Sequence, residues 1–80
     1  MSAAGEDLLA VVRLLVDDPR ATRVEEIVTG EAVELRLELA EADRGKVIGR
    51  HGRTIDALRS LAQARGRREG RDYAVELLEG

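Results

Sequence analysis

Two glycines that enclose a basic pair are the feature of this sequence with the clearest chemical use. The stretch VIGRHGR (residues 47–53) places Gly49 and Gly52 three positions apart, after an apolar pair and before a helical pattern. Glycine allows backbone conformations that a β-carbon forbids, and it lets another polymer approach closely. The helix that follows presents the positive end of its dipole, which attracts anions. Together with the basic side chains, these features suit contact with a phosphodiester backbone.

The charge of the chain is unevenly distributed along the sequence. The formal net charge is −3, from 13 Lys and Arg residues against 16 Asp and Glu residues. The segment from Arg44 to Arg71 holds nine basic and two acidic residues, a net charge of +7, while the remainder carries −10. Because local potential steers a charged ligand, this segment suits an anionic partner. A solvated, salt-bridged surface is the plainer explanation of such a charge run.

Length and composition exclude several classes of protein. Eighty residues allow a single domain with a thin core, expected over residues 1–80 with an ordered part of about residues 6–79. The chain has no cysteine, which suits a reducing cytoplasm. It shows neither a secretory leader pattern nor an apolar run of about 20 residues, so we expect no membrane partner.

The residues that could perform catalysis or bind a metal are too few. With one histidine and no cysteine, we expect no metal and no cofactor. Thr54 lies three residues after His51, but this pair lacks an orienting group, so we expect no catalytic residue and no enzyme. A P-loop is excluded because no lysine follows the second glycine. A small-molecule substrate is therefore not expected.

The hydrophobic pattern predicts the elements that position the glycines. Apolar residues from Leu8 to Val16 follow helical spacing, and Pro19 ends this helix. Alternation of apolar and charged residues predicts strands, and Thr29-Gly30-Glu31 predicts a hairpin turn. Gly66 is expected to cap the helix after the glycines, before a polar loop. The expected elements are a helix at 8–16, strands at 24–28 and 32–39, a helix at 41–48, a helix ending at 66, and a strand at 73–78.

This order predicts an α+β domain, helix-strand-strand-helix-helix-strand. The two hairpin strands are antiparallel, so the last strand must be parallel to one of them. We therefore expect a three-stranded mixed sheet covered on one face by three helices. Its other face would be solvated and mostly acidic, with the side chains of Glu34, Arg36, Glu38 and Glu76.

The stretch KVIGRHGRTIDALRSL (residues 46–61) resembles the signature of KH domains, and the element order resembles their type II arrangement. With LLVDDPRATRVEE (residues 14–26) and the hairpin, the chain resembles the KhpA family of small bacterial single-KH proteins along nearly its whole length. The resemblance implies an RNA chaperone or post-transcriptional regulator that binds single-stranded RNA. It also implies a homodimer, a heteromer with a larger KH protein, KhpB, or both, and a link to cell elongation and peptidoglycan homeostasis.

The resemblance also implies roles for individual residues. The GxxG loop at 49–52 would clamp the sugar-phosphate backbone over about four nucleotides, and Val47 and Ile48 would line an apolar groove for the bases. The loop from Gly66 to Asp72 would be the variable loop that grips the strand from the other side. The implied RNA-binding residues are Lys46, Val47, Ile48, Gly49, Arg50, His51, Gly52, Arg53, Arg67, Arg68 and Arg71.

The sequence is compatible with two functions. The one aromatic residue, Tyr73, is expected to face the core, so RNA binding would rest on phosphate contacts and would be weak and salt-dependent. Pairing of two such sites would raise avidity. The alternative is a protein-interaction or dimerisation module in which RNA binding is secondary. Surplus apolar residues on the first helix, and small residues at Ala57, Ser60 and Ala64, leave room for it.

Overall fold

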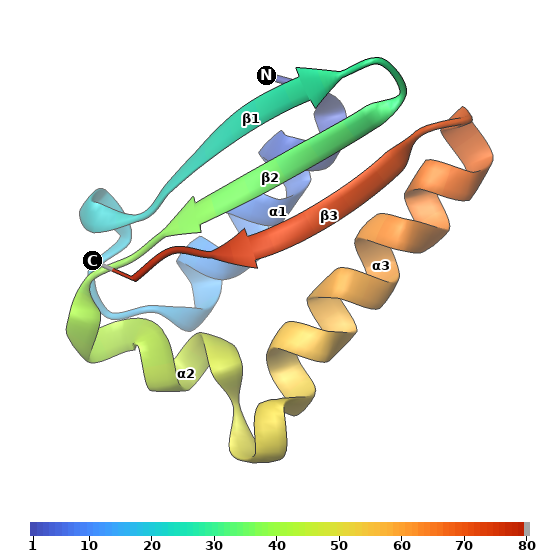
Figure 1. Cartoon of the computed structure of the whole chain (residues 1–80). Coiled ribbons are helices and arrows are strands. Elements are labelled where there is room, and N and C mark those ends of the chain that lie inside the picture. Colours follow the sequence, from blue (N-terminus) through green and yellow to red (C-terminus); the bar gives the residue numbers. More distant parts are fainter. Residues whose placement is uncertain (80) are drawn as a thin grey trace.

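A computed structural model of the chain describes residues 1–79. Three helices and three strands follow the expected order α-β-β-α-α-β, with three short 3-10 turns between them (Figure 1). The elements are α1 (Ala3–Leu15), η1 (Pro19–Ala21), β1 (Arg23–Thr29), β2 (Ala32–Glu38), η2 (Glu41–Asp43), α2 (Arg44–Ile48), η3 (Arg50–Gly52), α3 (Arg53–Glu69) and β3 (Asp72–Leu77).

The sheet has the order β1-β2-β3, with β2 antiparallel to β1 and parallel to β3. The β1–β2 register pairs Thr29 with Ala32, which leaves a two-residue turn in which Gly30 has a φ of 63°. Alternation along β2 buries Val33, Leu35 and Leu37, each 1% exposed or less. The α+β class and the mixed sheet predicted from the sequence are confirmed.

The helices cover one face of this sheet, and the core lies between the two layers (Figure 1). The core consists of Ala4, Leu8, Val12, Val33, Leu35, Leu37, Leu39, Val47, Ile55, Leu58, Tyr73 and Val75. Tyr73 is 2% exposed, which confirms the core position predicted for the one aromatic residue. Within residues 1–79, no helix combines the length and apolar character that crossing a membrane requires.

The prediction that Gly66 ends the last helix is wrong. Helix α3 continues to Glu69, and Gly70, with a φ of 70°, is the left-handed residue that caps it. A β-carbon on Gly66 would collide with the carbonyl oxygen of Arg71 and lie 3.3 Å from the ring of Tyr73. Gly66 is therefore required for close packing inside the helix, and the expected loop from 66 to 72 shrinks to two residues.

Candidate nucleic-acid interface

The two glycines join α2 to α3 through a single tight corner. Helix α2 ends at Ile48, and Gly49 follows with φ 75° and ψ 171°, a conformation that side chains oppose. The N–H of Gly49 donates to the carbonyl of Gly45 at 3.0 Å, and the N–H of Gly52 donates to the carbonyl of Gly49 at 3.1 Å. The chain therefore reverses within the short turn η3 and enters α3 directly.

The two glycines serve different purposes in this corner. A β-carbon on Gly49 would lie 2.7 Å from Cβ of Thr54 and 2.9 Å from its backbone nitrogen, so only glycine fits. A β-carbon on Gly52 would meet nothing within 4 Å, although its φ of 72° is left-handed. Gly49 thus allows the helices to pack, while Gly52 leaves backbone open to an approaching molecule.

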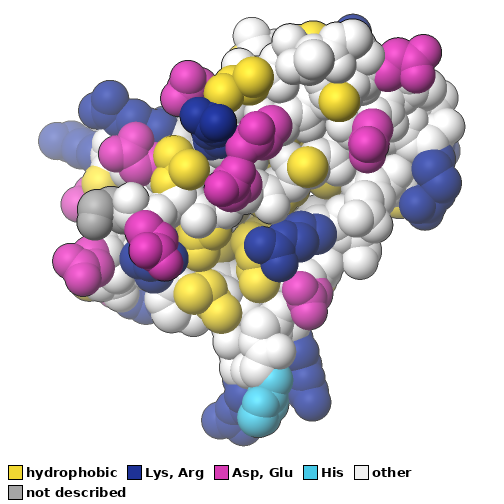
Figure 2. All heavy atoms as spheres, viewed as in Figure 1, with side chains coloured by type: hydrophobic (Ala, Val, Ile, Leu, Met, Phe, Trp, Pro, Cys, Tyr) yellow, Lys and Arg dark blue, Asp and Glu magenta, His cyan; other side chains and the backbone are white. Residues whose placement is uncertain are grey.

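The corner projects from the body of the protein and carries positive charge. Figure 2 shows the histidine at the tip of this projection, with Lys or Arg side chains beside it. Arg50, His51 and Arg53 are exposed, and none of their side chains has a hydrogen-bond or ion-pair partner within residues 1–79. His51 has a φ of 57°, and no side chain caps the N-terminus of α3. The corner therefore presents backbone and three basic side chains to solvent.

Lys46, which was expected to flank the clamp, is bound to two carboxylates. Its Nζ donates to Oδ2 of Asp17 at 2.7 Å and to Oδ1 of Asp43 at 3.4 Å. The hydrogen bond to Asp17 raises the pKa of Lys46 above its ordinary value, and Asp43 adds to this effect. Asp43 is 1% exposed and also accepts the backbone N–H groups of Asp17 and Asp18, each at 3.0 Å. The two carboxylates already balance part of the positive charge of Lys46. Its contact with RNA stays a prediction.

The apolar surface beside the corner differs from the expected one. Val47 is 0% exposed and belongs to the core, so the prediction that its side chain lines a groove is wrong. The short helix α2 turns Val47 toward the sheet and leaves its neighbour Ile48 half-buried. Leu77 and Leu78 are also half-buried, and Figure 2 shows hydrophobic side chains between the sheet and the projecting corner.

Two arginines outside the implied RNA-binding set bond to backbone carbonyls of β3 and of the residue that follows it. The guanidinium of Arg44 donates to the carbonyl of Leu78, and Nε of Arg59 donates to the carbonyl of Val75 at 3.2 Å. Arg59 also pairs with Asp56 at 3.5 Å. The sequence left Arg59 open between an RNA contact and a solvated role, because its place beside the edge strand depends on how α3 packs.

The remaining predicted arginines lie at the other end of α3. Arg67 and Arg68 are exposed in its last turn, and Arg71 is exposed in the two-residue loop before β3. Helix α3 has 17 residues and is therefore about 25 Å long. The expectation that Arg67 and Arg68 lie in a loop is wrong, because α3 continues through both residues to Glu69 (Figure 1).

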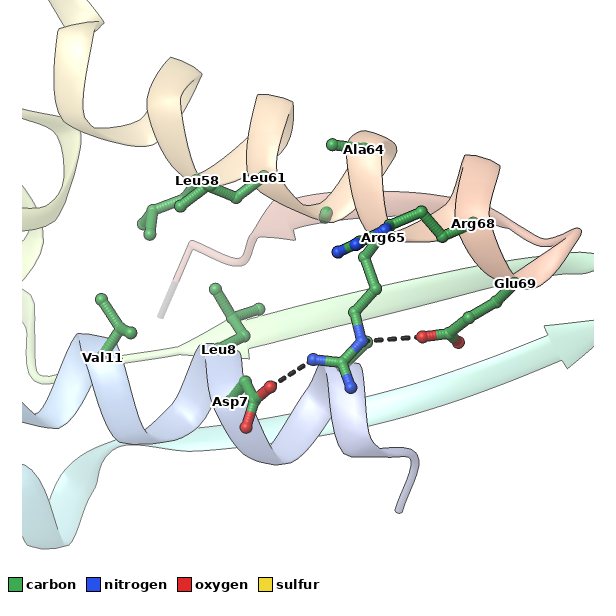
Figure 3. Close-up of a pocket in the computed structure, with 11 residues that line it drawn as sticks. Asp7, Leu8, Val11, Leu58, Leu61, Ala64, Arg65, Arg68 and Glu69 are labelled. Carbon is green, nitrogen blue, oxygen red and sulfur yellow. Dashed lines mark hydrogen bonds and ion pairs between the residues drawn. The ribbon is translucent and has the colours of Figure 1, made fainter.

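A separate apolar groove lies between α1 and α3 (Figure 3). It measures about 610 Å³, and Val11 and Leu61 line it while remaining 41% and 66% exposed. At one end, Arg65 pairs with Asp7 on α1 and, at 2.7 Å, with Glu69 on α3. The groove is therefore apolar along its length and bordered by an ion-pair network.

An α-β-β-α-α-β fold with a GxxG corner between two helices defines the chain as a KH domain of the type II arrangement. The family described as "KhpA/KhpB, KH domain" matches residues 6–77. The chain therefore belongs to the KhpA/KhpB KH-domain family. This is not an enzyme family, in agreement with the expectation from the sequence.

Individual relatives match along nearly their whole length. The "RNA-binding protein KhpA" of Aquifex aeolicus is 38% identical over 79 residues, which cover 99% of this chain and all of the relative. The protein of the same name from Treponema pallidum is 42% identical over 76 residues, covering 92% and 94% of the two chains. That of Caldanaerobacter subterraneus is 36% identical over 74 residues, covering 92% and 99%.

Proposed function

We propose that this chain binds single-stranded RNA in the cytoplasm and holds its sugar-phosphate backbone at the glycine corner. The observation that carries the proposal is the exposed corner, where Gly52 leaves open backbone and three basic side chains have no partner within residues 1–79. Phosphate contacts of this kind are largely independent of sequence. Similarity to relatives named RNA-binding proteins supports the same function.

The mode of binding follows from the side chains that are present. Tyr73 is buried, so no Phe, Tyr or Trp side chain within residues 1–79 offers a stacking surface for bases. Because stacking contributes about 1–3 kcal/mol per base, one copy binds weakly, and its affinity falls with salt. Assembly as a homodimer, or with a KhpB-like KH protein, would compensate by raising avidity.

Membership of the KhpA/KhpB family supports a role at the level of the cell. We propose that the chain acts as an RNA chaperone or post-transcriptional regulator in cell elongation and peptidoglycan homeostasis.

A double substitution at the corner tests the RNA-binding proposal. Arg50→Asp/His51→Asp reverses the local charge, and aspartate tolerates the left-handed backbone at position 51. We expect loss of binding to a random-sequence 12-nucleotide RNA, measured by fluorescence anisotropy, with an unchanged circular dichroism spectrum and oligomeric state. The control Arg20→Asp/Arg23→Ala alters the formal charge equally at two exposed positions outside the corner. Equal binding by the two variants would contradict the clamp.

The second candidate function is a protein-interaction module, and the groove between α1 and α3 favours it. Leu61 is 66% exposed within this groove, whereas Leu14 is 86% exposed but does not line it. If the groove is an assembly surface, Leu61→Arg lowers the sedimentation coefficient of the assembly, and Leu14→Arg does not. A monomeric wild-type protein at micromolar concentration with full RNA affinity would exclude this candidate as the main function.

A further inference from the structure

The ammonium group of Lys46, the one lysine of the chain, lies between two carboxylates. Its Nζ donates to Oδ2 of Asp17 at 2.7 Å and to Oδ1 of Asp43 at 3.4 Å. Lys46 is in α2, one helical turn before Gly49, whereas Asp17 lies in the segment that joins α1 to η1 (Figure 1). An ammonium group has three N–H donors, so these two bonds leave a third for a phosphate.

The two carboxylates differ in what the fold requires of them. The side chain of Asp43 is 2% exposed and accepts the backbone N–H groups of Asp17 and Asp18, each at 3.0 Å. The side chain of Asp17 is 81% exposed and accepts from Lys46. The backbone of Asp17, not its carboxylate, thus anchors the segment after α1 to Asp43. The carboxylate of Asp17 is left to act on Lys46.

This cluster carries net negative charge beside a corner that is positive. Lys46 contributes +1, and Asp17 and Asp43 contribute −1 each, so the three groups sum to −1. Exposed ion pairs contribute little to stability, because solvent screens their attraction. Asp17 therefore has more effect on the charge that Lys46 presents to a ligand than on the stability of the fold.

A phosphate bound at Lys46 would meet the Asp17 carboxylate at close range. Two oxygens that accept from one ammonium group at about 2.8 Å each lie about 4.6 Å apart, because the N–H bonds are tetrahedral. Two unit charges at about this distance in water repel by an amount that changes an affinity about fivefold. The phosphate must therefore displace Asp17 from Lys46 or bind against its repulsion.

We infer that the Asp17 carboxylate competes with RNA phosphate for Lys46, and that it holds the affinity for RNA below the value that Lys46 and the corner would otherwise give. The inference rests on the proposed function and on the predicted RNA contact of Lys46. Two other roles of Asp17 make different predictions. A purely structural ion pair changes stability only, and a carboxylate that orients Lys46 toward RNA gives weaker binding when its charge is removed.

The test compares Asp17→Asn with Asp18→Asn, which removes the same charge one position away. Both residues are exposed and keep a backbone N–H that donates to Asp43, but within residues 1–79 it is the Asp17 carboxylate that binds Lys46. With the random-sequence 12-nucleotide RNA at low salt, we expect Asp17→Asn to bind about three- to tenfold more tightly than Asp18→Asn. The slope of log K against log salt should steepen by about 0.7, the contribution of one phosphate contact to a single strand.

A second pair of variants shows whether this gain acts through Lys46. In a Lys46→Gln background, the glutamine amide keeps hydrogen-bond donors but has no charge to offer a phosphate. Adding Asp17→Asn to this background should give no more affinity than adding Asp18→Asn. The inference is overturned if Asp17→Asn alone binds RNA no more tightly than Asp18→Asn, or if its extra gain is as large in the Lys46→Gln background.

NMR can follow Lys46 directly, because a single lysine gives a single side-chain ammonium signal. The 12-nucleotide RNA should shift the Nζ signal of Lys46 in the wild-type protein and shift it further in Asp17→Asn. An Nζ signal that RNA leaves unshifted in both proteins would show that Asp17 has nothing to compete for.

These outcomes separate the two proposals. Wild-type binding that Arg50→Asp/His51→Asp abolishes, with no gain from Asp17→Asn, overturns only the role of Asp17. Failure of both the wild-type protein and Asp17→Asn to bind the 12-nucleotide RNA overturns both.

Discussion

Gly49 packs against Thr54 so closely that a β-carbon would lie 2.7 Å from Cβ of the threonine. This contact brings the end of α2 against the first turn of α3. Gly52, on the outer side of the same corner, has no such neighbour. The motif therefore combines one glycine needed for packing with one that leaves the surface open.

Alanine substitutions should separate these two purposes. We expect Gly49→Ala to lower the free energy of unfolding by about 2–5 kcal/mol, from backbone strain and overpacking together. Gly52→Ala should cost about 1–2 kcal/mol, because only its left-handed conformation opposes a side chain. Urea unfolding followed by circular dichroism measures both values. Equal stability of the two variants would contradict the different roles.

Alanine at Gly66, inside α3, should change stability in the direction opposite to its usual effect in a helix. A glycine-to-alanine change inside a helix ordinarily stabilises by about 0.5–1 kcal/mol. Gly66→Ala should instead destabilise by about 1–3 kcal/mol, because its β-carbon would collide with the carbonyl of Arg71. Gly45→Ala in α2, where a β-carbon meets nothing within 4 Å, is the matched control and should not destabilise. A stabilising Gly66→Ala would show that the loop can move aside.

The buried carboxylate of Asp43 should make stability fall in acid. Its hydrogen bond from the N–H of Asp17, with further help from Asp18 and Lys46, lowers the pKa of Asp43 below the ordinary 3.8. A folded-state pKa below the unfolded one gives stabilisation that is complete above 3.8 and lost as the pH falls through the folded value. Asp43→Asn should therefore lower the melting temperature at pH 7, and the difference from wild type should narrow below pH 3.8.

Thermal melts followed by circular dichroism between pH 2 and 7 measure this effect. Asp18→Asn keeps its backbone N–H and changes only an exposed side chain, so it should melt like the wild type throughout. A melting difference between Asp43→Asn and wild type that is the same at pH 3 and pH 7 would contradict the assignment.

The carboxyl pair Glu34 and Glu76, on the open face of the sheet, should make stability fall as the pH rises, opposite to the effect of Asp43. The hydrogen bond between Glu34 and Glu76 raises the pKa of Glu76 above its ordinary value and lowers the pKa of Glu34. For Glu76, the stabilisation is present below the unfolded pKa and is lost as the pH rises through the folded one. Glu76→Gln keeps a hydrogen-bond donor at every pH. It should therefore raise the melting temperature by a few degrees at pH 7 and change it little at pH 3.

Glu38→Gln is the comparison for this variant, because Glu38 is exposed in the neighbouring strand β2. If Glu38→Gln raises the melting temperature at pH 7 as much as Glu76→Gln, general relief of negative charge explains the gain and the pair does not.

Several parts of the fold could be predicted because their signals are local. Alternation at Val33, Leu35 and Leu37 marks a half-buried strand whatever it packs against, and the burial of all three confirms it. The break between two helices at Gly49 and Gly52 has a local signal too, because glycine allows the positive φ angles that both residues adopt. Other assignments failed because one local signal suits two structures: Gly66 resembles a helix cap in sequence, yet it is an interior contact with Arg71.

The amino-acid sequence by itself determined the order of elements, the mixed sheet and the glycine corner, because backbone preference and hydrophobic period act over a few residues. Tertiary structure alone decided which cations pair with carboxylates far away in the sequence. Lys46 meets Asp17 across 29 positions and Arg65 meets Asp7 across 58, so neither pair has a sequence signal. Packing against the sheet also buries Val47 rather than Ile48 in the core. Arg67 and Arg68 lie in the last turn of α3, far from the glycine corner. Charge pairing and burial depend on distances between remote segments, and only the packed fold sets those distances.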